Sequence, residues 1–134
     1  MSLDRERRFE EFQEFLGRFI GELNHASAEG AAVLVEGKRD VKALAALGYS
    51  GETFTMADLS SPTRSAKLAG HETVVILTDL DAEGRRLAAR CAKLLPRMGL
   101  KASLAQRKRF SAASGGVFLH VENLRRFARD EASS

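Results

Sequence analysis

The chain has 134 residues, 44% of them apolar and 29% charged, which suits one domain with a core and is too few for two of ordinary size. Its single cysteine, Cys91, excludes an intramolecular disulfide. No run reaches the roughly 20 apolar residues of a membrane span, and the charged start does not resemble a signal peptide. We therefore expect a soluble cytoplasmic protein. The net charge of +3 is unevenly distributed, with −5 in residues 1–81 and +8 in residues 82–134, which favours a polyanionic partner.

The first predicted element is a long amphipathic helix. Apolar residues recur at spacings of three and four over residues 5–25, with charged residues between them. They are Phe9, Phe12, Leu16, Phe19, Ile20 and Leu23. We expect residues 1–28 to form a helix that packs on a domain made by residues 29–134. The alternative is that a partner protein, or a second copy of the chain in a homodimer, covers this face.

Strands and helices are predicted to alternate along the rest of the chain. Short apolar or β-branched runs predict strands at residues 33–35, 53–56, 73–78 and, more weakly, 101–105. Helical patterns occupy residues 39–47, 60–70, 83–98 and 121–130, and residues 111–116 read as a loop. This alternation predicts an α/β fold with a mostly parallel four-stranded sheet flanked by helices.

Acidic residues follow two of these strands. Asp79 and Asp81 come after the most apolar run, and Glu36 follows the first strand. Since the carboxyl ends of parallel strands meet at one edge, three carboxylates would converge there and repel one another unless a hard divalent cation neutralises them. The simpler alternatives are that Asp81 only caps the next helix and that Gly37 only makes a tight turn.

Two segments carry a resemblance to a known family. VEGKRD at residues 35–40 and TDLDAEG at residues 78–84 resemble the two signature motifs of the Toprim domain, and HVENL at residues 120–124 resembles a later segment of that family. The resemblance covers about residues 31–128. Within the superfamily, the chain is most similar to small stand-alone proteins of the ribosomal-RNA maturase ribonuclease type.

The resemblance implies a single compact Toprim domain, which is Rossmann-like, with Mg²⁺ at the acidic cluster and Mn²⁺ as the alternative ion. Asp79 and Asp81 match the metal-binding aspartates, and Glu36 matches a glutamate that acts as general acid or base and sometimes as a metal ligand. Gly37 and Gly84 match glycines that let the backbone approach the site. The appended tyrosine-bearing and zinc-binding segments of topoisomerases and primases have no counterpart here.

Basic residues are concentrated after the acidic motif. Nine Lys or Arg and no acid lie between residues 85 and 109, and several fall on one side of the predicted helix at 83–98. An ordinary solvated helix face is the alternative. The candidate phosphate-binding residues are Lys38, Arg39, Arg85, Arg86, Arg90, Lys93, Arg107 and Arg109, with Arg97 on the same helical arc. For His120 a capping role is favoured over catalysis.

The sequence therefore predicts magnesium-dependent phosphodiester chemistry on RNA or DNA, of the nuclease or RNA-processing type. Glu36, Asp79 and Asp81 are the predicted catalytic and metal-binding residues. The alternative is a non-catalytic nucleic-acid-binding or assembly module that needs a partner for activity.

Overall fold

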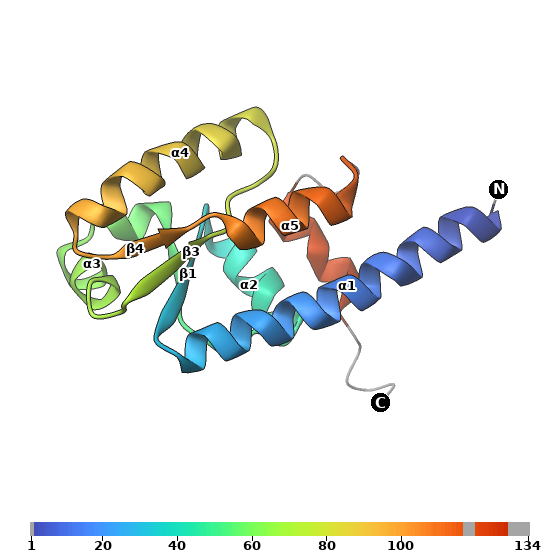
Figure 1. The fold of residues 1–134 in the computed structure, drawn as a ribbon, viewed down its shortest axis with the longest axis horizontal. Helices are drawn as coiled ribbons and strands as arrows, with labels where there is room; N and C mark the ends of the chain where they lie inside the picture. Colours follow the sequence, from blue (N-terminus) through green and yellow to red (C-terminus); the bar gives the residue numbers. More distant parts are fainter. Residues whose placement is uncertain (1, 117–119, 129–134) are drawn as a thin grey trace.

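The computed structural model describes residues 2–116 and 120–128. Four strands, β1 (Ala31–Val35), β2 (Thr53–Thr55), β3 (Thr73–Ile76) and β4 (Lys101–Ser103), form one sheet in the order β2-β1-β3-β4. Every pairing between neighbouring strands is parallel, as predicted (Figure 1). The helices are α1 (Ser2–Ala28), α2 (Lys38–Ala46), α3 (Pro62–Leu68), α4 (Ala82–Arg97) and α5 (Ala105–Ser114), with 3-10 helices η1 (Met56–Ser60) and η2 (Val121–Phe127).

Helices cover both faces of the sheet. Successive residues of a strand point to opposite faces, so Val33 and Val75 pack under α1, α2, α5 and η2, whereas Leu34 and Ile76 pack under α3 and α4. Because both faces are buried, β1 is apolar throughout and β3 is apolar after its first residue, Thr73, so neither strand alternates between apolar and polar residues. The architecture is the α/β sandwich that the sequence predicts.

The N-terminal helix packs on the domain through its phenylalanine-rich face. Phe12, Leu16 and Phe19 are buried, and the ring of Phe9 stacks on that of Phe127 with 4.5 Å between centroids. In Figure 1 the first turns of α1 extend beyond the other elements. The buried face is covered by the same chain, while the division into units 1–28 and 29–134 stays a prediction.

The structure corrects the sequence reading in three places. Residues 105–114 form α5 where residues 111–116 were expected to be a loop, because Phe110 and Ser114 are buried on the domain. The closing segment is the 3-10 helix η2, with residues 129 and 130 of the expected helix outside the described residues. The helical period over residues 83–98 predicts Leu94 on the apolar side with Cys91 and Leu95, yet Leu94 is 38% exposed, because the buried side of α4 is formed by Gly84, Ala88, Cys91 and Leu95.

Within the described residues, none of the helices combines the length and the apolar character that a membrane crossing requires.

Candidate metal and phosphate site

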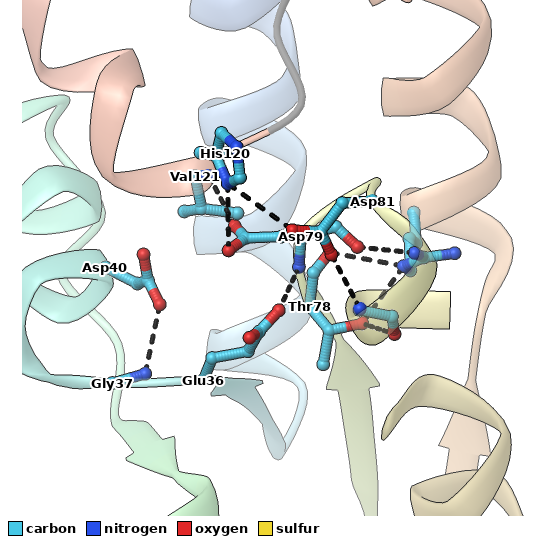
Figure 2. A network of polar contacts seen from close by, with 10 residues as sticks. Glu36, Gly37, Asp40, Thr78, Asp79, Asp81, His120 and Val121 are labelled. Carbon is cyan, nitrogen blue, oxygen red and sulfur yellow. Dashed lines mark hydrogen bonds and ion pairs between the residues drawn. The ribbon is translucent and has the colours of Figure 1, made fainter. Parts of the chain in front are cut away.

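The three predicted acids lie together at the carboxyl edge of the sheet (Figure 2). Glu36 directly follows β1, Asp79 follows the neighbouring strand β3, and Asp81 is the residue that caps α4. The Glu36 carboxylate accepts a hydrogen bond from the backbone N–H of Asp79, with 2.7 Å between Oε2 and N. The parallel pairing of β1 with β3 therefore produces the convergence that the sequence predicts.

Asp79 is held by contacts from several segments. Its Oδ1 accepts the backbone N–H of Val121 at 2.7 Å, which ties the start of η2 to the site. Its backbone carbonyl accepts the Arg107 guanidinium at 2.6 Å. The second carboxylate oxygen, Oδ2, lies 3.5 Å from His120 Nδ1. Asp79 thus keeps one carboxylate oxygen directed at the shared site while the other fixes its orientation.

Asp81 divides its two oxygens in the same way. Oδ1 accepts the backbone N–H of Gly84 at 2.7 Å, which is the helix cap considered as the simpler reading. Oδ2 lies 3.7 Å from His120 Nδ1. Capping and ligation are therefore compatible, because they use different oxygens of one carboxylate.

The two motif glycines differ in what their positions require. A Cβ atom at Gly84 would lie 1.8 Å from the carbonyl oxygen of Asp79, so only glycine allows the first turn of α4 to approach the strand end. The hydroxyl of Thr78 donates to the Gly84 carbonyl at 2.6 Å across this contact. At Gly37 a Cβ would meet nothing within 4 Å; its N–H donates to the carboxylate of Asp40 at 3.0 Å.

The concentration of negative charge changes the proton affinity of the site. Partial burial raises the pKa of Glu36, and the charges of Asp79, Asp81 and Asp40 raise it further against the opposing hydrogen bond from Asp79 N–H. Burial likewise raises the pKa of Asp40, which is only 5% exposed. A bound cation would relieve this repulsion.

The donor set fits a divalent metal ion. Asp79, Asp81 and His120 each offer one ligand atom, and these atoms lie within 4.8 Å of one another. Carboxylate oxygens suit Mg²⁺ and Mn²⁺, and imidazole nitrogen suits transition metals. Glu36 stands beside this group with one oxygen already bonded to Asp79 N–H, and its role as a ligand stays a prediction.

The predicted phosphate-binding residues separate into two groups in the structure. The first group is exposed: Lys38 and Arg39 start α2, and the others, Arg85, Arg86, Arg90, Lys93 and Arg97, follow one another along α4. Arg86 pairs with Glu83, whereas within the described part of the chain Arg85, Arg90, Lys93 and Arg97 form no ion pair.

The second group is engaged within the protein. The Arg107 guanidinium donates to the carbonyls of Thr78 and Asp79 and to the Thr78 hydroxyl, so it supports the strand end that carries the acids. Burial lowers its pKa. Arg109 forms an ion pair with Glu22 of α1. These two side chains join parts of the fold, and their role toward phosphate stays a prediction.

The part that His120 plays in the site was underestimated from the sequence, which favoured a capping role. It occupies the cap position of η2, yet its side chain makes no capping hydrogen bond and points to the two aspartates. Its contacts join positions 41 and 39 residues apart, which no local pattern reveals. The available signal was its place as the first residue of the HVENL segment.

Comparison with known proteins agrees with the fold and identifies relatives of the chain. The family model of the Toprim domain matches residues 30–106. A UPF0292 protein of Methanosarcina barkeri is 38% identical over 88% of this chain and 80% of its own length, and one of Pyrococcus horikoshii is 30% identical over 92% and 86%. A solved structure, a putative protein from Aquifex aeolicus, superposes with a TM-score of 0.62 at 29% identity, covering 79% of this chain and 94% of that one.

Proposed function

The chain belongs to the Toprim domain family, and on that premise we propose that it carries out magnesium-dependent phosphodiester chemistry on nucleic acid. The observation that carries the proposal is the meeting of Glu36, Asp79 and Asp81 at the end of a helix whose exposed face is cationic. The proposed metal-binding acids and the proposed phosphate-binding cations are then neighbours at the amino end of α4. The proposed reaction is cleavage or processing of RNA or DNA.

Each acid has a distinct part in this proposal. Asp79 and Asp81 hold the ion through their Oδ2 atoms, since their Oδ1 atoms are engaged by Val121 and Gly84. A bound divalent ion stabilises negative charge on phosphoryl oxygens and lowers the pKa of an attacking water. Glu36 accepts or returns the proton, a role that suits a carboxylate whose pKa is raised.

The basic face of α4 binds the phosphate backbone of a nucleic acid, so this binding does not depend on the base sequence. Arg90, Lys93 and Arg97 are exposed at spacings of three and four, so their side chains follow one line along the helix. Arg85, in the first turn, lies at the amino end of α4, where the helix dipole also favours an anion. A phosphate backbone placed along this line would reach the acids at the amino end of the helix.

Metal-dependent cleavage is the test. Wild-type protein is incubated with structured and single-stranded RNA and DNA in Mg²⁺, Mn²⁺ or chelator, beside Glu36→Gln and Asp79→Asn. The matched control is Glu72→Gln, which neutralises an exposed acid at the opposite end of β3. We expect cleavage in the wild type and control and a loss of at least 100-fold in both site variants. If nothing is cleaved, or if the site variants cleave normally, the proposed hydrolysis is wrong.

The second candidate function is nucleic-acid binding without catalysis. The observation that favours it is the cationic line of Arg90, Lys93 and Arg97, which has no ion-pair partner among the residues that the structure describes and needs no acid to bind phosphate. Salt-dependent binding with no turnover, unchanged by Asp79→Asn, would support this function over hydrolysis.

A further inference from the structure

The free ligand atoms at the site include a nitrogen. Asp79 Oδ2 and Asp81 Oδ2 both face His120 Nδ1, at 3.5 and 3.7 Å. A direct N–H···O hydrogen bond is about 2.7–3.2 Å long, so both separations exceed the ordinary range. The imidazole therefore faces the carboxylates without closing on either of them.

These separations match donor atoms arranged around an ion. Donors lie about 2.0–2.2 Å from a first-row transition metal, so neighbouring donors around one ion are about 3.0–3.4 Å apart. The two separations from His120 Nδ1 exceed that spacing by a few tenths of an ångström, and all three donor atoms lie within 4.8 Å of one another, so an inward movement of the side chains would bring them around one ion. The side chain of His120 is 47% exposed, which leaves room for water as a further ligand.

The backbone next to His120 is held by Asp79, which is also a candidate metal ligand. The next residue, Val121, donates its N–H to Asp79 Oδ1, so the carboxylate that would bind the ion also holds the backbone beside the histidine. Val121 is fully buried, and the η2 segment packs against α2. The histidine thus precedes a segment anchored by the buried side chains of Val121, Leu124 and Phe127, even though its own side chain is 47% exposed.

We propose that His120 is a metal ligand and that its nitrogen makes the site selective for a transition-metal ion of the Mn²⁺ class over Mg²⁺. The inference rests on the proposed function in that Asp79 and Asp81 hold the same ion. Imidazole is a good ligand for transition metals, whereas Mg²⁺ prefers oxygen donors and retains its waters. The same two aspartates without the histidine would discriminate less between the ions.

Mn²⁺ itself is the probe, because its electron spin detects directly bound nitrogen. The 134-residue protein without an affinity tag is loaded with Mn²⁺, and electron spin-echo envelope modulation is recorded for wild type, His120→Asn and the control His25→Asn. His25 is exposed on α1, and its side chain pairs with Glu29. Calorimetric titrations with Mn²⁺ and with Mg²⁺ give both dissociation constants for each protein.

We expect ¹⁴N modulation in the wild type and the control and none in His120→Asn. We also expect His120→Asn to weaken Mn²⁺ binding by at least about tenfold and Mg²⁺ binding much less. Mn²⁺ binding that Asp79→Asn abolishes, without nitrogen modulation in the wild type, would overturn the inference and leave the proposed function standing. Modulation that persists in His120→Asn would overturn it as well. If the wild type binds neither ion, both proposals fail.

Discussion

Replacing Gly84 by alanine should break the contact between α4 and the end of β3. The added methyl group would lie 1.8 Å from the Asp79 carbonyl oxygen and 2.5 Å from its carbonyl carbon. Both are backbone atoms, so no side-chain rotation can relieve the clash. The first turn of α4 must then move away from the strand. That movement strains the Asp81 cap and the bond from the Thr78 hydroxyl to the Gly84 carbonyl.

The size of the effect can be worked out from these contacts. Loss of a helix cap costs about 1 kcal/mol, loss of a buried hydrogen bond about 1 kcal/mol, and forced overpacking about 1–3 kcal/mol. Alanine returns about 1 kcal/mol because it is the better helix former. We therefore expect the free energy of unfolding to fall by about 2–4 kcal/mol and the melting temperature to fall by on the order of 10 °C.

The assay is urea and thermal unfolding of Gly84→Ala beside two matched controls. Gly17 lies exposed inside α1 with nothing within 4 Å, so Gly17→Ala should stabilise the protein by up to about 1 kcal/mol. Gly37 belongs to the other motif, also has open space and adopts an extended φ of −149°, so Gly37→Ala should change stability by less than about 0.5 kcal/mol. Equal stability of Gly84→Ala and Gly37→Ala would refute the close approach.

Three further predictions concern charged groups. Arg107→Lys should lower the free energy of unfolding, measured by chemical denaturation, by about 2–3 kcal/mol. One ammonium group cannot make all the hydrogen bonds that the guanidinium group donates to Thr78 and Asp79. A change within experimental error would contradict this prediction. Arg90→Ala combined with Lys93→Ala should reduce the slope of log affinity for RNA or DNA against log salt by about 1–2, whereas Lys67→Ala, whose partner is Glu52, should leave the slope unchanged. Glu36→Gln should gain stability over wild type as the pH rises, in metal-free melting curves; a pH-independent difference would count against the raised pKa.

The sign of the Glu36 prediction follows from proton linkage. A raised pKa means that the folded protein keeps the Glu36 proton at a pH where the unfolded chain has released it. Stability of the wild type therefore declines between the unfolded pKa and the higher folded pKa, and the full cost remains above both. Glutamine does not titrate and avoids that cost.

The strands and the acidic edge were predictable because they depend on local patterns. The run 73–78 is apolar enough to be a central strand, and a parallel sheet brings the residues after its strands to one edge. Helix α5 was not predictable in the same way. It carries one large apolar residue, Phe110, among charged and small residues, and tertiary packing rather than periodicity holds it in place.

Tertiary contacts also decide which polar residues join the site. Nothing local indicates that Arg107 turns back to the end of β3 or that Arg109 pairs with α1. His120 enters the site only because η2 packs against α2 and its first residue, Val121, bonds to Asp79. By contrast, the spacing of Val121, Leu124 and Phe127 is a strict three, which is the period of a 3-10 helix and could have been read as such.

The contacts around Asp79 have a consequence for when the site can form during synthesis. Residue 36 bonds to its backbone N–H, residue 107 to its carbonyl and residue 121 to its carboxylate, so four stretches of chain complete one site. During synthesis the last of these stretches leaves the ribosome long after the acids themselves. A growing chain that already displays both acidic motifs still lacks the hydrogen bond from residue 121 that orients the Asp79 carboxylate, so the acidic site is complete only after this late segment has folded onto the domain.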